Sequence, residues 1–379
     1  MSTSATPVVT IRTDILNRVK AATCADDLYP FLQSAVELEH ATIPAYLTAL
    51  YSIKLGTNTA VAQIIHSIVV EEMLHMTIAA NVLNAIGGQP SINHPGFIPK
   101  YPGPLPMSVD DGLIVPLAPV SLDLVQNVFM RIELPETPRH YPSFALGYAQ
   151  RGYATIGEFY DAIIERILFL GPSIFTGDPA RQVVDNTWFP PNQLFPITDV
   201  ESAVRGLNVI KRQGEGTPDD PLESDGQPAH YYRFEEIVRG RRLVKDDRVP
   251  EGYSFTGDAV PFHPEGVINL VRNSKLADYQ KGSLAYAGVE QANYTYTSLL
   301  NALHTTFNGQ PGTLRASLGL MFELRLVVLE KVVNQLVIDP DAPHYGQFAA
   351  PAFQFAAPAA TADFVAVPVV TAETALVPS

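Results

Sequence analysis

The chain has 379 residues, 46% of them hydrophobic, which is enough for a sizeable core in one large domain or two modest ones. It carries 39 acidic and 25 basic residues, and the net charge of -14 argues against nucleic acid or an anionic membrane as the main partner. The single cysteine, Cys24, excludes an internal disulfide framework and any thiolate-rich metal site, so carboxylates and imidazoles would have to hold a metal.

The first twenty residues lack a continuous apolar stretch behind basic residues, so they do not resemble a secretory signal. By composition, no apolar run is long enough to span a bilayer. We therefore expect a cytoplasmic protein whose partners are a small molecule or a metal, and the sequence is compatible with a homodimer.

Residues 27–88 are predicted to form a helical hairpin, because apolar residues recur at spacings of three and four between glycine breaks. The stretch 89–119 is dense in proline and glycine, which predicts an ordered crossover or lid. Apolar stripes at 156–170 and 199–213 predict a second hairpin. Two helical hairpins joined by a long crossover are the connectivity of ferritin-like bundles, so we predict an all-α, ferritin-like four-helix bundle.

Residues 214–264 are rich in glycine, proline and charge, and are predicted to be loops with one short helix at 229–239. Two more helices are predicted at 276–307 and 313–338, as an additional C-terminal hairpin packed on the bundle. From residue 356 the sequence is mostly Ala, Pro, Val and Thr, which gives too little varied apolar bulk for a core. We predict one domain over 1–355 and a flexible tail over 356–379.

Glu72 and His75 lie on the inward, otherwise apolar stripe of the second predicted helix. A buried carboxylate is costly unless it is paired or bound to a metal, so Glu72 requires a partner. A Glu-x-x-His pair is what a metal-binding bundle places on one helix. The apolar members of the stripe are Ile65, Ile68, Val69, Met76, Ala79, Leu83 and Ile86.

Glu39 lies on the inward stripe of the preceding helix, and Tyr46 follows two turns later on the same face. We expect Tyr46 either to hydrogen-bond a ligand carboxylate, as its catalytic contribution, or to be an ordinary core tyrosine. Another Glu-x-x-His match, Glu37 and His40, points away from the core by the same periodicity. We therefore exclude that match as a ligand pair.

A buried salt-bridge cluster without metal is the alternative for Glu39, Glu72 and His75, since an isolated Glu-x-x-His match is common by chance. The two helices place no Lys or Arg on their inward stripes, which favours the metal. The mixed oxygen and nitrogen ligand set is typical of iron or manganese. We expect two iron ions, with manganese or a mixed pair as the variants.

The second predicted hairpin contains no Glu-x-x-His, so its ligands are less clearly marked. Glu158 is the first choice on its first helix, and Glu165 shares that face and competes with it. The remaining candidates are Glu215, in RQGEGT, and His230, in AHYYRFEEI, which meet only if the loop between them folds back. For each of these the alternative is a solvated charge near a helix end.

Five sequence blocks together resemble a known family. Two are specific, LQSAVELEHATIPAYLTALYSIK and VVEEMLHMTIAANVLNAIGGQP, and three shorter ones follow in the expected order, IGEFYDAI, RQGEGT and HYYRFEEI. They are similar to the ferritin-like domain family named after the iminophenyl-pyruvate dimer synthases of bisindole biosynthesis, and AAPAFQF is similar to a closing motif of that family. The resemblance covers residues 32–355, and the spacing of Glu39, Tyr46, Glu72 and His75 also resembles the ligand pattern of ferritins.

The resemblance implies a carboxylate-bridged dimetal site. For named members it also implies the oxidative joining of two tryptophan-derived imines in violacein-type and rebeccamycin-type pathways. Those synthases are longer chains with additional regions, so the resemblance does not fix the substrate here.

We therefore expect a diiron oxidoreductase in which Glu72 and Glu158 bridge the two irons. His75 and His230 cap them, dioxygen binds, and a small organic molecule such as an amino-acid-derived imine of secondary metabolism is oxidised. The alternative is a ferritin-like metal-binding or storage protein without an organic substrate, which the long insertions and the extra hairpin disfavour.

Overall fold

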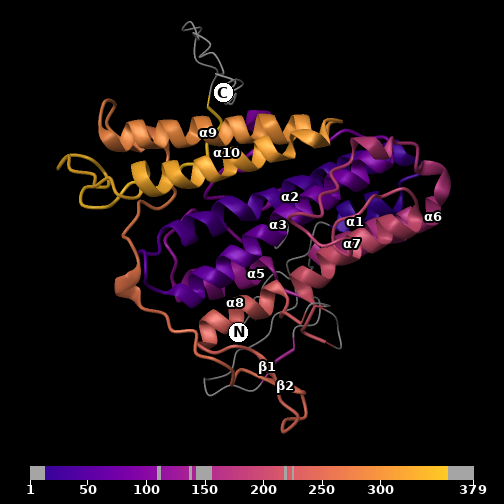
Figure 1. Cartoon of the computed structure of the whole chain (residues 1–379), viewed down its shortest axis with the longest axis horizontal. Coiled ribbons are helices and arrows are strands. Elements are labelled where there is room, and N and C mark those ends of the chain that lie inside the picture. Colours follow the sequence, from indigo (N-terminus) through magenta and orange to yellow (C-terminus); the bar gives the residue numbers. More distant parts are fainter. Residues whose placement is uncertain are drawn as a thin grey trace, which may run out of the picture.

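The computed structural model describes residues 13–108, 112–135, 139–141, 156–216, 220–223 and 226–356. These residues are mostly helical, as the sequence predicts, with one antiparallel pair of two-residue strands (Figure 1). The helices and strands are α1 (Thr13–Lys20), α2 (Ala25–Tyr51), α3 (Thr59–Ala85), α4 (Leu122–Leu124), α5 (Met130–Ile132), α6 (Ile156–Leu170), α7 (Val200–Glu215), α8 (His230–Arg239), β1 (Val244–Lys245), β2 (Tyr253–Ser254), α9 (Leu284–Phe307) and α10 (Leu314–Val327).

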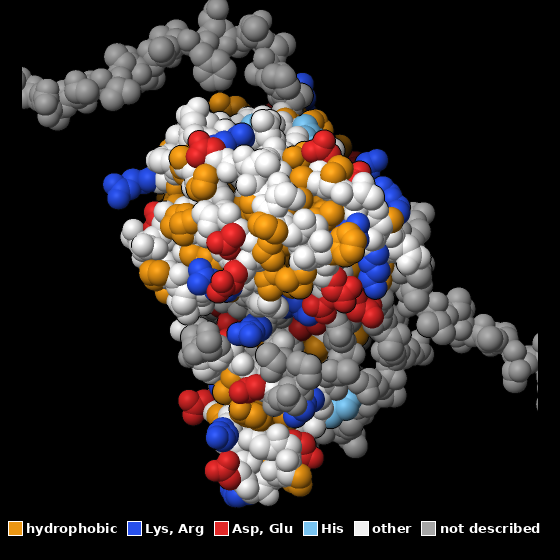
Figure 2. All heavy atoms as spheres, turned by 90° about the vertical axis from the view of Figure 1, so that its right-hand side faces the viewer, with side chains coloured by type: hydrophobic (Ala, Val, Ile, Leu, Met, Phe, Trp, Pro, Cys, Tyr) orange, Lys and Arg blue, Asp and Glu red, His pale blue; other side chains and the backbone are white. Residues whose placement is uncertain are grey.

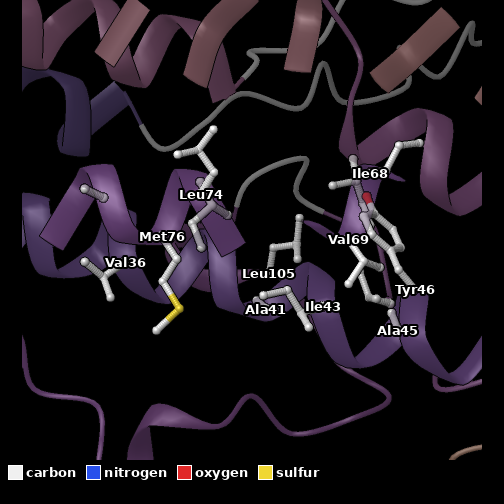
Figure 3. Packing of buried hydrophobic residues seen from close by; sticks show 14 of the residues in the cluster. Val36, Ala41, Ile43, Ala45, Tyr46, Ile68, Val69, Leu74, Met76 and Leu105 are labelled. Atoms are coloured by element: carbon white, nitrogen blue, oxygen red, sulfur yellow. The ribbon is translucent and has the colours of Figure 1, made fainter. Parts of the chain in front are cut away.

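The long hairpin of α2 and α3 runs through the centre of the molecule (Figure 1). Apolar side chains of the two helices pack together, including Tyr46, Ile68 and Val69 (Figure 3). The length and apolar composition of α3 would also suit a membrane span, contrary to the expectation from sequence, but more than half of that stretch is buried inside the protein. As a core helix α3 carries side chains that contact partners on both sides of the hairpin.

Each half of the second hairpin is divided into separate helical segments. Its first half begins with α4, capped by the Ser121 hydroxyl, and continues through a π-helical turn (Val125–Phe129) into α5. The sequence reading missed this segment, whereas α6, α7 and α8 confirm the predicted helices. In Figure 1, α5 and α8 lie along one half of the α2–α3 hairpin, and α6 and α7 lie along the other half.

The additional C-terminal hairpin covers the opposite side of α2 and α3 (Figure 1). α10 continues through a π-helical turn, Val328–Val332, so this helix ends before the predicted position 338. α9 starts at Leu284 and not at 276, because Leu276–Asp278 form a separate 3-10 turn and the Ser283 hydroxyl caps the helix. The predicted tail lies outside the described residues from 357 onward.

The surface shows hydrophobic side chains scattered among charged ones on the face in Figure 2. Such exposed residues include Leu168 and Phe169 at the end of α6. Apolar side chains exposed one or two at a time are normal for a folded protein, so they require no partner.

Candidate metal centre

The helical periodicity of α2 and α3 brings Glu39, Glu72 and His75 together in the core. Their relative exposures are 5%, 2% and 1%. His75 Nδ1 lies 3.3 Å from Glu39 Oε2 and 3.9 Å from Glu72 Oε1. The structure thus assembles the three residues that the inward stripes predict as ligands.

His230 and Glu133 complete the cluster from the interrupted hairpin. His230 is the first residue of α8, and its Nδ1 atom lies 2.9 Å from Glu72 Oε1 and 3.4 Å from Glu133 Oε2. Glu72 Oε1 therefore faces the Nδ1 atoms of both imidazoles, whose rings stack with centroids 5.3 Å apart. Within the described residues, Glu72, His75 and His230 offer ligand atoms that all lie within 4.8 Å of one another.

Glu133 was missed by the reasoning from sequence. It directly follows α5 and is 6% exposed. A signal was present, because Val125, Phe129 and Glu133 recur at a spacing of four and Val125 and Phe129 are fully buried. Because no helix was predicted over 122–132, the spacing of these three residues was not recognised as a helical face. Glu133 occupies the place in the cluster that the sequence reading gave to Glu158.

The structure does not bring Glu158 or Glu165 into the cluster. Glu158 is partly exposed in the first turn of α6, and Glu165 is two-thirds exposed with its carboxylate 3.9 Å from Lys20 Nζ. Both glutamates lie on a face of α6 that does not point into the core, because the inward positions of this helix are taken by residues such as Tyr160 and Ile163. Glu165 remains a surface charge.

Glu215 lies beside the cluster, at the last position of α7. Its Oε1 atom accepts a hydrogen bond of 2.6 Å from the backbone N–H of Gly157, at the start of α6. A side chain at Gly157 would collide with this carboxylate, since a Cβ atom there would lie 2.5 Å from Glu215 Oε2. Glu215 thus joins the two helix ends that border the interruption.

Each cluster carboxylate accepts a hydrogen bond from a buried hydroxyl group. Tyr46 OH donates to Glu133 Oε1 at 2.5 Å, and Thr42 Oγ1 donates to Glu72 Oε2 at 2.9 Å. Tyr160 OH donates to Glu39 Oε1. Tyr46 is therefore one of three hydroxyl residues that fix the orientation of the carboxylates.

The outer nitrogen of each histidine is also held. His75 Nε2 lies 2.8 Å from Gln213 Oε1 of α7, and His230 Nε2 lies 2.8 Å from Glu71 Oε2 of α3. An amide oxygen and a carboxylate accept hydrogen bonds, so both Nε2 atoms carry the proton of the neutral ring. When these rings are neutral, their Nδ1 lone pairs therefore point into the cluster, as metal ligation requires.

Arg233, one turn after His230, is ion-paired with the acidic partner of that ring. Its guanidinium group is ion-paired with Glu71 and lies 3.0 Å from Glu223 Oε1, and the residue is only 2% exposed. Burial raises the pKa of Glu71, but the hydrogen bond with His230 and the Arg233 charge outweigh burial and lower that pKa to about 2. Glu71 is therefore ionised.

Protons compensate the excess of negative charge in the cluster. Burial and the charge of Glu133 raise the pKa of Glu72 to about 7. Burial lowers the pKa of His75, but Glu39 outweighs it and raises that pKa. Burial is likewise outweighed at His230, where Glu133 and the neighbouring carboxylates hold the pKa well above its ordinary value. The metal-free cluster therefore retains protons that bound metal ions would displace.

His40 lies outside the cluster, as its periodicity predicts, yet it is 3% exposed. The C-terminal hairpin covers it, and its Nε2 atom lies 2.6 Å from Tyr296 OH of α9. Burial lowers the pKa of His40 to about 3, so the ring is neutral. This histidine joins the bundle to the extra hairpin.

A small cavity adjoins the cluster at the interruption of the second hairpin. Its volume of about 20 Å³ accommodates a molecule the size of water. Glu39, His75 and Tyr160 line it, with Glu133 and Glu215 also at its wall. The apolar part of the wall consists of Leu38, Ile132, Ile156 and Ile210.

The geometry agrees with comparisons to known proteins. A family model described as ferritin-like matches residues 32–239, more than half of the chain. The chain belongs to the ferritin-like family. The match includes every residue of the cluster, from Glu39 to His230, and it confirms the predicted ferritin-like, all-α fold.

A solved structure of a ferritin-like protein from Caulobacter vibrioides is similar to this chain. The two share 28% sequence identity and a TM-score of 0.55, over 80% of this chain and 93% of that one. No curated protein sequence matches the chain. The ferritin-like assignment thus extends over most of the described residues.

The ferritin-like cluster has the composition of a possible transition-metal site. It contains three buried carboxylates and two buried imidazoles, Glu39, Glu72, Glu133, His75 and His230. His230 Nδ1 lies within ion-pair distance of Glu72 but makes no well-aligned hydrogen bond to any described residue. Oxygen and imidazole ligands in this ratio suit iron or manganese.

Proposed function

We propose that the protein is a non-haem dimetal oxidoreductase that uses two iron ions and dioxygen to oxidise a small organic molecule. The observation that carries the proposal is the position of Glu72, whose carboxylate faces both His75 and His230, with Glu39 near the first histidine and Glu133 near the second. A carboxylate shared between two imidazole-bearing halves is the arrangement of dimetal bundles.

In this proposal Glu39 and His75 would hold one ion and Glu133 and His230 the other, and Glu72, which faces both histidines, would be shared by the two ions. Iron bound there would supply the redox chemistry by which dioxygen oxidises an organic molecule. The hydroxyl groups of Thr42, Tyr46 and Tyr160 orient the carboxylates, and the buried aliphatic surroundings exclude bulk water.

The cavity gives a small molecule access to the ligand side chains Glu39 and His75. Its volume suits dioxygen or water. The resemblance of the sequence blocks to the iminophenyl-pyruvate dimer synthase family supports an amino-acid-derived imine as the organic substrate. We extend the proposal to that class.

The small volume of the cavity also favours a second candidate, a ferritin-like metal-binding or storage protein without an organic substrate. Iron uptake distinguishes the two. A storage protein takes up many irons per chain, whereas a dimetal enzyme takes up about two.

Dioxygen consumption tests the proposed enzyme. Protein loaded anaerobically with ferrous iron is mixed with air-saturated buffer, with and without aromatic amino acids converted in situ to their imines. We expect catalytic consumption in the parent and in Glu165→Ala, a surface control, and none above background in Glu72→Ala. If dioxygen were consumed only once, in proportion to the bound iron and regardless of the imine added, and if the protein then continued to take up iron, the storage function would be favoured.

A further inference from the structure

Two half-sites share Glu72. The α7 half-site consists of Glu39, His75, Tyr160 and Gln213, and the α8 half-site consists of Glu133, His230, Tyr46 and Glu71. Each contains one carboxylate held by a tyrosine hydroxyl and one histidine whose Nε2 atom is held by a side-chain oxygen. The two half-sites therefore have the same arrangement of side chains but differ in the identity of individual residues.

The first difference is the charge behind the histidine. The α7 half-site places the neutral amide of Gln213 at His75 Nε2, whereas the α8 half-site places the carboxylate of Glu71 at His230 Nε2, both at 2.8 Å. Arg233 fixes that carboxylate by ion pairing. A negatively charged acceptor at the outer nitrogen makes an imidazole a stronger metal ligand than a neutral one does.

The second difference is access. Glu39, His75 and Tyr160 of the α7 half-site line the cavity. Only Glu133 of the α8 half-site reaches the cavity wall, and His230, in contrast to His75, does not line it. His230 is fully buried. An ion in the α8 half-site would therefore exchange with solvent less readily.

We infer that the two metal positions are unequal: the α8 half-site binds its ion first and more tightly, and the α7 half-site holds the exchangeable ion that faces the cavity. This inference rests on the proposed dimetal function and specifies how that site works. Stronger ligation sets the order of filling, and poorer access slows the exchange of the ion in the same half-site.

Single-site variants measure the two affinities separately. His75→Ala retains the α8 half-site and His230→Ala retains the α7 half-site. Each is titrated anaerobically with cobalt(II) chloride and followed by visible absorbance, after circular dichroism has established parent-like helicity. We expect about one ion per chain in each variant, with His75→Ala binding cobalt about 10–100-fold more tightly, the range that outer hydrogen-bond partners control.

Two further variants test the cause of the inequality. In the His75→Ala background, Glu71→Gln should weaken cobalt binding by about 10–100-fold, because the acceptor at His230 Nε2 becomes neutral. In the His230→Ala background, Gln213→Glu should strengthen binding by a similar factor. The second change removes no ion pair, so it tests the inference even where Glu71→Gln disturbs folding through Arg233.

The outcomes separate this inference from the proposed function. Failure of the parent chain to bind cobalt or ferrous iron would overturn the dimetal proposal and the inference with it. Two bound ions in the parent, with equal affinities in His75→Ala and His230→Ala, would leave the dimetal proposal standing and overturn the inference. Tighter binding by His230→Ala would overturn it as well.

Discussion

Metal binding should release protons in a number that depends strongly on pH. Ligands must be deprotonated to bind a metal, and three cluster groups retain protons in the metal-free protein. Burial and Glu133 raise the pKa of Glu72 to about 7, while carboxylate neighbours raise the pKa values of His75 and His230 in spite of burial. The ordinary pKa values of glutamate and histidine side chains therefore do not describe the protonation of this site.

The expected number follows from these pKa values. At pH 6 a group with a pKa of about 7 is about nine-tenths protonated, and both imidazoles are mostly protonated, so loading two ions should release roughly three protons. At pH 8 Glu72 retains only about a tenth of a proton, so the release should fall by roughly 0.8 proton from this group alone, while His230, whose pKa lies well above its ordinary value, still contributes. Since raised pKa values keep protons in competition with metal at low pH, apparent affinity must increase with pH.

Isothermal titration calorimetry with manganese(II) chloride measures the release, because manganese avoids oxidation during the experiment. Titrations at pH 6 and pH 8 are repeated in buffers with different ionisation enthalpies, and the slope of the heat against that enthalpy gives the protons released. Fewer than one proton at pH 6, or equal numbers at the two pH values, would refute the reasoning about the cluster.

Two further predictions concern stability. Gly177→Ala should lower the free energy of unfolding by about 1–3 kcal/mol in urea denaturation, since a Cβ atom would lie 1.8 Å from the Asn84 carbonyl oxygen, whereas Gly312→Ala, in open space, should have little effect. Tyr296→Phe should cost about 1–3 kcal/mol by leaving His40 Nε2 buried without a partner, and it should leave manganese stoichiometry unchanged because His40 is outside the cluster. A change in stoichiometry would contradict the placement of that histidine.

The ligands on α2 and α3 were predictable because those helices are long and uninterrupted. Each keeps one inward stripe over 27 residues, so a carboxylate or imidazole on the stripe is evident from spacing alone. The same periodicity separates Glu39 from His40. It does not show that His40 is buried, since the cover comes from α9, more than 240 residues later in the chain.

The second half of the cluster depends on contacts that spacing does not encode. Glu133 follows a helical segment of only 11 residues, and the hairpin resumes at Ile156. The acceptors behind the histidines, Glu71 and Gln213, are polar residues whose role depends on which helix packs against them. The sequence motifs RQGEGT and HYYRFEEI do mark the end of α7 and the start of α8, which border the site.

Metal content per chain tests the central claim most directly. Protein purified without chelator is analysed by mass spectrometry beside Glu72→Ala and the surface control Glu165→Ala. We expect about two irons in the parent and the control and none in Glu72→Ala, because the Glu72 carboxylate faces both histidines. A parent protein that binds no metal, even after anaerobic addition of ferrous iron, would contradict the account.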